Sequence, residues 1–167
     1  MDPKTNLVKA KGTRRHPENG DIFYMRLPTG NYLFGRVRFA EASREKAPMP
    51  GATLIYIYSW QSPTPQPDYT MLRRDRLLIP PLWTNRMSWT KGYFQHVENR
   101  AGDDRIIFGP SCFHDKFRDR YVNEHGNRVS GRAEPCGSWA LVSYRGIDDR
   151  VSDAVGIVRV PMEPGDR

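Results

Sequence analysis

Two β-prone stretches on either side of a glycine turn constrain the fold of this chain more than any other feature of its sequence. They lie in GDIFYMRLPTGNYLFGRV, residues 20–37, where the residues PTGN form the turn. Successive side chains of a strand point to opposite faces of a sheet. One face of the returning strand is apolar or small: Leu33, Gly35, Val37 and Phe39. The other begins aromatic and ends cationic: Tyr32, Phe34, Arg36 and Arg38. We expect the first face to form core and the two arginines to be exposed.

A third strand follows in TLIYIYSW, residues 53–60. Both of its faces are apolar or aromatic, which is typical of a central strand. The sequence therefore predicts that residues 21–27, 31–40 and 53–59 pair consecutively as antiparallel strands. We expect Tyr56 and Tyr58 to be mostly buried.

The second half of the chain repeats strands and turns less regularly. We expect one strand around residues 92–98 and another over residues 105–108. Residues 117–122 and 128–129 flank the glycine-containing stretch EHGN, and this order predicts a hairpin.

A short helix is expected near the C-terminal end, over residues 148–155, with Asp148 as its N-cap and Gly156 as its C-cap. The predicted fold class is therefore α+β: a mainly antiparallel β-sheet, partly barrel-like, with one or two short helices. We divide the chain into a basic, flexible N-terminal tail over residues 1–18 and a single domain over residues 19–167.

Positive charge is concentrated in the first half of the chain. The net charge of +7 divides into +6 for residues 1–80, with 13 Lys and Arg against 7 Asp and Glu, and +1 for residues 81–167, with 13 against 12. Such a distribution favours an acidic partner, whether nucleic acid, a membrane surface or an acidic protein. The alternative is that these charges only solvate the surface.

No sequence motif indicates catalysis or a bound metal, because P-loop, dinucleotide, paired-histidine zinc and nucleophile-elbow patterns are all lacking. One cluster combines a thiol, an imidazole and two carboxylates: Cys112, His114, Asp115 and Asp119. Such spacing arises easily by chance, and the alternative is a packed thiol near a surface histidine. Two cysteines also make no disulfide framework. We therefore expect reduced thiols, no catalytic residue, no metal and no cofactor.

The sequence gives no sign of a membrane segment. No apolar run approaches the roughly 20 residues of a membrane helix. The first residues are not followed by the apolar region of a signal peptide. We expect a cytoplasmic protein without a membrane partner.

Nucleic-acid binding is an alternative function that basic residues near aromatic ones support. The relevant cations are Arg36, Arg38, Arg73, Arg74 and Arg76. Arginines bind phosphates and aromatic rings stack on bases. However, no signature of a known nucleic-acid module accompanies these residues, and core packing explains the aromatic side chains equally well.

Six blocks, in matching order, resemble the immunity protein 26 family of bacterial polymorphic toxin systems. They are GDIFYMRLPTGNYLFGRV, LIYIY, LLIPP, GYFQHVEN, YVNEHGNRV and GSWALVSYRGIDDRVSDAVG, spanning about residues 20–156. The resemblance implies a non-enzymatic antidote that binds a cognate toxin domain and neutralises it.

Combined with the basic first half, the resemblance favours an acidic toxin domain as partner. Arginine suits such contacts because its planar donors pair with carboxylates bidentately. The predicted partner-binding residues are Arg36, Arg38, Arg73 and Arg74. A basic nucleic-acid-binding module remains the alternative.

Overall fold

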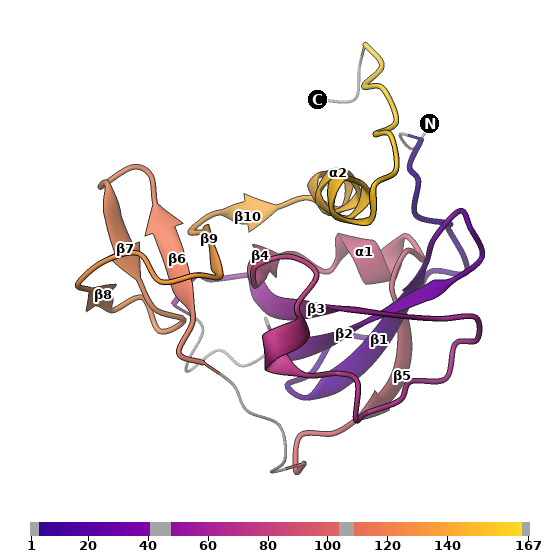
Figure 1. Ribbon diagram of the computed structural model, residues 1–167, viewed down its shortest axis with the longest axis horizontal. Helices are drawn as coiled ribbons and strands as arrows, with labels where there is room; N and C mark the ends of the chain where they lie inside the picture. The colour runs from indigo at the N-terminus through magenta and orange to yellow at the C-terminus, as the bar shows by residue number, and fades with distance from the viewer. Residues whose placement is uncertain (1–3, 41–47, 104–108, 165–167) are drawn as a thin grey trace.

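The protein folds into two β-sheets and two helices in a computed structural model that describes residues 4–40, 48–103 and 109–164 (Figure 1). We call the six-stranded sheet, of order β10-β4-β3-β2-β1-β5, the large sheet and the four-stranded sheet, of order β8-β7-β6-β9, the small sheet. The large sheet contains β1 (Asp21–Arg26), β2 (Tyr32–Phe39), β3 (Thr53–Ser62), β4 (Leu82–Thr84), β5 (Gln95–Asn99) and β10 (Leu141–Val142). The small sheet contains β6 (Cys112–Asp115), β7 (Arg120–Val122), β8 (Arg128–Val129) and β9 (Cys136–Ser138). The two helices are α1 (Met87–Thr90) and α2 (Tyr144–Val155), and a 3-10 turn, η1 (Arg74–Arg76), precedes β4.

The three strands predicted from the alternating pattern are confirmed. β1 pairs with β2 and β2 with β3, both antiparallel. Gly30 adopts a φ of 92° in the first turn, a conformation that favours glycine. At Gly35, a Cβ atom would lie 2.2 Å from the ring of Phe23, so the ring occupies the space that a larger residue would need.

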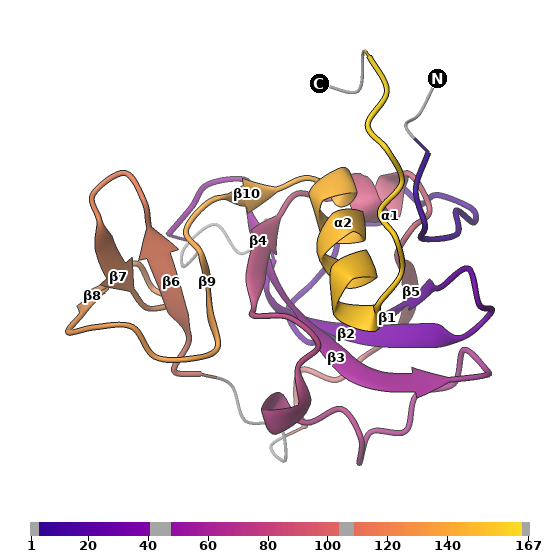
Figure 2. The same ribbon diagram turned by 45° about the horizontal axis from the view of Figure 1, so that its top comes forward.

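Both faces of the large sheet are covered, which explains why β3 carries apolar side chains in both directions. On one face, Val37 and Ile57 pack in a cluster that also contains Ile147 of α2. Helix α2 lies across this face in Figure 2. On the other face, Tyr56 and Tyr58 pack in a cluster closed by aromatic and aliphatic side chains of residues 69–77. The predicted burial of both tyrosines is confirmed, since each is 1% exposed.

Helix α2 begins four residues before the predicted start at Asp148. Its N-cap is Ser143, whose hydroxyl accepts a hydrogen bond from the backbone N–H of Gly146 at 3.1 Å. Gly156 ends the helix with a φ of 80°, as predicted. The prediction that Asp148 caps the helix is wrong, because its carboxylate is fully buried and accepts hydrogen bonds from the backbone N–H groups of Asn6 and Leu7 at 3.1 and 2.7 Å.

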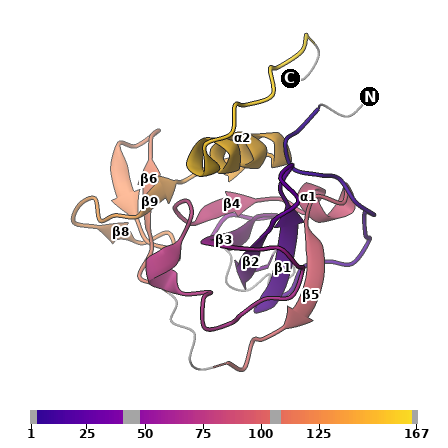
Figure 3. The same cartoon turned by 45° about the vertical axis from the view of Figure 1, so that its right-hand side comes forward.

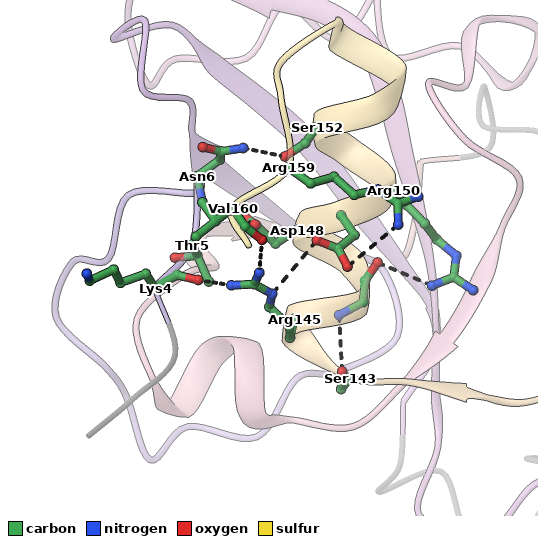
Figure 4. A network of polar contacts seen from close by, with 12 residues as sticks. Lys4, Thr5, Asn6, Ser143, Arg145, Asp148, Arg150, Ser152, Arg159 and Val160 are labelled. Atoms are coloured by element: carbon green, nitrogen blue, oxygen red, sulfur yellow. Dashed lines mark hydrogen bonds and ion pairs between the residues drawn. The ribbon is translucent and has the colours of Figure 1, made fainter. Parts of the chain in front are cut away.

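A polar network joins α2 to two segments from opposite ends of the chain (Figure 4). The guanidinium of Arg145 donates to the carbonyl oxygens of Lys4 and Val160. The side-chain amide of Asn6 donates to the Ser152 hydroxyl at 2.9 Å. Lys4, Asn6 and Leu7 therefore contact α2 where the sequence predicted a flexible tail, and the domain boundary at residue 18 stays a prediction.

The small sheet contains the predicted hairpin of β7 and β8, in which Tyr121 opposes Val129. Its β6 also pairs with β9 in parallel. Neither sheet closes into a barrel within the residues that the structure describes, so the barrel-like component of the prediction is not found. The strand expected over residues 105–108 lies outside the described residues.

Three aromatic side chains join the two sheets. Trp83 of β4 is fully buried, and its ring centroid lies 5.9 Å from that of Phe113 on β6 and 5.6 Å from that of Trp139. Phe113 and Trp139 also contact each other, at 5.8 Å. The small sheet thus rests on the end of β4, and α2 begins beside this junction because β10 leads directly into it.

Candidate functional site

A cleft of about 500 Å³ lies between the small sheet and the N-terminal end of α2. One wall is formed by residues 114–117, at the end of β6 and in the turn that follows. The floor and the opposite wall come from residues 138–143, together with Gly146 and Arg150 of α2. In Figure 1 the chain runs from β9 of the small sheet through β10 to α2. Residues from these three elements and from the end of β6 line the cleft.

The turn after β6 displays Phe117 with its side chain completely exposed. Buried Asp115 holds this turn, because its carboxylate accepts hydrogen bonds from the backbone N–H of Arg118 and from the side chain of Arg120, each at 3.3 Å. Asp119 takes the left-handed conformation, with a φ of 46°, which aspartate tolerates better than most residues. The turn is therefore fixed by specific contacts while its apolar residue faces solvent.

A second exposed apolar side chain lies on the other side of the cleft. Leu141 of β10 is 50% exposed, whereas its neighbour Val142 is buried against the core. Between the walls, Trp139 is half-buried and packs on Trp83 and Phe113. The cleft thus has an aromatic and aliphatic surface supported by the junction of the two sheets.

The charges around the cleft are unequally compensated. The carboxylate of Asp115 pairs with Arg118 and Arg120. Burial works to raise the pKa of Asp115, but hydrogen bonds from these two residues outweigh it and hold the pKa below its usual value. On the same wall, Nε2 of His114 lies 3.2 Å from the Asp119 carboxylate. The described residues provide no carboxylate partner for the exposed cations Lys116 and Arg150.

The structure places two of the predicted binding arginines inside the large sheet rather than at its exposed end. Arg36 is 1% exposed, opposes Tyr56 in the β2–β3 register, and has a pKa lowered by burial. The prediction that this end of β2 is exposed is therefore wrong for Arg36, because residues 69–77 help to cover that face. Arg38 is half-buried, and its guanidinium lies 4.1 Å from the ring centroid of Phe39.

The other two predicted arginines lie on η1 and just before it. Arg73 is exposed and forms a bidentate pair with Asp75, at 3.0 and 2.8 Å. Arg74 donates to the carbonyl of Pro110, and its guanidinium lies 5.7 Å from the ring centroid of Tyr56. Arg36 and Arg74 thus flank the same tyrosine, but the four arginines do not form one exposed patch. Their role in binding a partner stays a prediction.

The cysteine and histidine cluster is divided between two environments. Cys112 opposes Cys136 of β9, both thiols are buried, and their Sγ atoms lie 2.6 Å apart. Burial raises the pKa of Cys136 to about 12. Within residues 4–40, 48–103 and 109–164, no hydrogen bond joins Cys112 to His114, and no group of three His, Cys, Asp or Glu side chains is placed to hold a metal ion.

No helix among the described residues is both long and apolar enough to cross a membrane. The family model described as immunity protein 26 matches residues 18–123 of the chain. The chain belongs to the immunity protein 26 family. Searches of curated proteins and of solved structures found no match.

The immunity protein 26 model covers only one of the two walls of the cleft. The matched residues 18–123 include β1 to β7 and therefore the wall that carries Phe117. The opposite wall, formed by residues 138–150, lies beyond the match. Sequence reasoning missed Phe117 by placing it in a strand. The available signal was the stretch DKFRDR, in which a single aromatic residue stands among charged ones without an alternating apolar partner.

Proposed function

We propose that this member of the immunity protein 26 family neutralises a cognate polymorphic toxin in the bacterial cytoplasm by binding the toxin domain non-covalently. The observation that carries the proposal is the cleft, in which a fixed turn presents the fully exposed ring of Phe117 opposite Leu141. Exposed large apolar side chains gathered at one concave site are typical of interaction surfaces.

The rigidity of the turn supports binding through Phe117. Aromatic anchors contribute most to an interface when they are held in place before the partner arrives, since less conformational entropy is then lost. Asp115 provides this restraint through Arg118 and Arg120. The described residues thus combine an apolar anchor with a support that does not depend on the partner.

Neutralisation by binding requires no chemical step from this protein. The Cys112 thiol faces Cys136, whose raised pKa disfavours a nucleophilic thiolate at neutral pH. The nucleic-acid alternative rested on arginines that the structure does not gather: Arg36 is buried and Arg73 is paired with Asp75. We therefore favour a protein partner.

The test is to co-express the toxin domain encoded beside this gene with the wild-type protein, with Phe117→Ala, or with Phe23→Leu as a conservative core variant. We expect survival with the wild type and the core variant, and loss of protection with folded Phe117→Ala. Size-exclusion chromatography with light scattering should show a one-to-one complex for the wild type. A folded wild-type protein that neither binds nor protects against this toxin domain would refute the proposal.

A further inference from the structure

We infer that the cleft receives an acidic segment of the toxin domain, in which a large apolar side chain is flanked by carboxylates. This inference rests on the proposed function and specifies the chemistry of the partner at that site. It combines three properties of the cleft: two cations on opposite walls, the positive end of a helix, and an exposed apolar surface.

The first property is the pair of cations. Lys116 belongs to the wall made by the turn after β6, and Arg150 belongs to the opposite wall made by α2. Both are exposed, and the described residues form no ion pair with either. Among the described residues, the Nη1 atom of Arg150 donates to the carbonyl of Gly146, at 3.2 Å, and the other N–H donors of the guanidinium can bind a carboxylate from a partner.

The carboxylates closest to these cations in sequence or on the same wall are engaged elsewhere. Asp115 is buried and pairs with Arg118 and Arg120, and Asp119 pairs with His114. On α2, Asp149 lies near Arg145 and Arg159, at 3.8 and 4.0 Å. The uncompensated charge of the cleft is therefore positive, which complements an acidic segment.

The second property is the orientation of α2. Its N-terminal residues Ser143 and Gly146 line the cleft, and no acidic residue lies in its first turn. A helix N-terminus carries partial positive charge that attracts anions, and this helix of 12 residues leaves that charge without a carboxylate of its own. The helix end thus adds to the potential of Lys116 and Arg150.

The third property decides between a peptide and a nucleic acid. Phe117 and Leu141 add exposed apolar surface to the cleft that Lys116 and Arg150 also line, and buried Val142 belongs to the same lining. Single-stranded nucleic acids are held by grooves that follow the backbone with successive cations and stacking rings. Here the cleft lining contains one exposed ring, one exposed aliphatic side chain and one exposed cation from each wall, without a row of successive cations. This arrangement fits an apolar side chain with a carboxylate on either side.

The test uses two double variants with equal changes in charge. Lys116→Glu/Arg150→Glu reverses the cleft, whereas Arg14→Glu/Arg128→Glu reverses two exposed cations outside it. Association with the toxin domain encoded beside this gene is measured by surface plasmon resonance at low and high salt. We expect the cleft variant to lower the association rate by roughly tenfold or more and to lose its salt dependence, since steering of this kind changes rates by about 10–1,000-fold. The control should remain within about threefold of the wild type.

A crosslinking experiment identifies the segment directly. Phe117 is replaced by p-benzoylphenylalanine, the complex is irradiated, and the crosslinked toxin peptide is sequenced by mass spectrometry. We expect a peptide with an aromatic or large aliphatic residue between acidic ones. A basic peptide, or a stable complex without a crosslink at this position, would overturn the inference.

The outcomes separate this inference from the proposed function. If the wild type binds and protects while the cleft variant does so equally well, the acidic-segment inference fails and the antidote proposal stands. If the folded wild type does not bind the toxin domain, the proposed function fails and the inference fails with it. Binding of a random-sequence 20-nucleotide oligonucleotide at physiological salt, lost in the cleft variant only, would replace the toxin segment by nucleic acid.

Discussion

The large and the small sheet differ in how completely their side chains are enclosed. In the large sheet, β2 and β3 have 8 and 10 residues, and side chains on both faces are buried. In the small sheet, no strand within the described residues exceeds 4 residues, and the turn between β6 and β7 exposes Phe117 fully. The large sheet contributes most of the buried core, whereas the small sheet presents an exposed apolar side chain to solvent. The exposed turn and its cleft are thus built outside the main core, and their rigidity comes from the contacts of Asp115.

The small sheet also lies far from the two chain ends, whereas the N-terminal segment contacts the large sheet, where the backbone N–H of Val8 donates to the carbonyl of Arg26. Figure 3 shows segments 4–8 and 157–164 leaving together beside α2, on the opposite side from the small sheet. The predictions below compare substitutions in the enclosed region with matched ones near the exposed region.

The largest contrast should come from reversing the charge of a buried and an exposed arginine. Arg36→Glu places a carboxylate beside Tyr58 in the enclosed face of the large sheet. We expect it to lower the unfolding free energy by about 3–5 kcal/mol, the typical cost of an uncompensated buried charge. Arg150→Glu, at an exposed position, should change it by less than about 0.5 kcal/mol. Urea unfolding measures both, and equal stability of the two variants would abolish the distinction between the regions.

Removing an aromatic ring should have opposite consequences in the two sheets. Tyr56→Ala deletes a side chain that is 1% exposed, and we expect a loss of about 3–5 kcal/mol, as for other large buried rings. Phe117→Ala should change stability by less than about 0.5 kcal/mol but impair toxin binding. Tyr56→Phe isolates the contact of the hydroxyl with Ser111 and should cost about 0.5–1.5 kcal/mol. An unaltered melting temperature in Tyr56→Ala would contradict its enclosure.

Acid should destabilise the large sheet through Asp21. Burial works to raise the pKa of this carboxyl, but hydrogen bonds from Arg15, Asn99 and the backbone N–H of Glu18 outweigh it and hold the pKa below its usual value. The ionised carboxylate of Asp21 contributes its full stabilisation of the folded state above the ordinary aspartate pKa of about 3.9. This contribution is lost as the pH falls through the lower pKa of the folded state.

We therefore expect Asp21→Asn to flatten the decline of unfolding free energy between neutral and acid pH. Asp115→Asn in the small sheet should flatten it less, because its partner Arg118 is 66% exposed. Denaturant unfolding at a series of pH values measures the slopes. A steeper slope in Asp21→Asn than in the wild type would show that the sign is wrong.

The smallest effect concerns the rate at which the two thiols react. Cys112 and Cys136 are buried, and burial raises the pKa of Cys136 to about 12, so modification by a maleimide at neutral pH should require opening of the small sheet. Short strands with few buried residues open locally before the whole protein unfolds. We expect modification at urea concentrations below the global transition. Reaction only within the global transition would show that both sheets open as one unit.

Local pattern predicted β1, β2 and β3 of the large sheet, because their period of two and their turn residues are encoded by neighbours in sequence, but it did not predict β4 or β10. The burial of Arg36 was not predictable in this way, since part of the covering surface comes from residues 69–77. Two good capping residues, Ser143 and Asp148, lie near the start of α2. The contact of Asp148 with Asn6 and Leu7 decides which one is used, and no local rule contains that contact.

The cleft was still less accessible to sequence reasoning. Phe117 and Leu141 are 24 residues apart, and they approach the same cleft only because the small sheet packs on the end of β4. The parallel pairing of β6 with β9, which aligns Cys112 with Cys136, likewise depends on tertiary packing. The family resemblance indicated a binding role but no particular surface for it.

Because the N-terminal segment binds to α2, the complete fold cannot form until α2 has been synthesised. The carboxylate of Asp148 is synthesised 142 and 141 residues after the two backbone amides that donate to it. At about 5–20 residues per second, the ribosome needs roughly 7–30 s to cover that interval. Strands β1, β2 and β3 can pair well before this interval ends. The backbone N–H of Leu7 gains its acceptor only when Asp148 of α2 has been synthesised. The complete fold therefore forms only after this delay. A ribosome that stalls before α2 yields a chain in which Asn6 and Leu7 lack the carboxylate of Asp148.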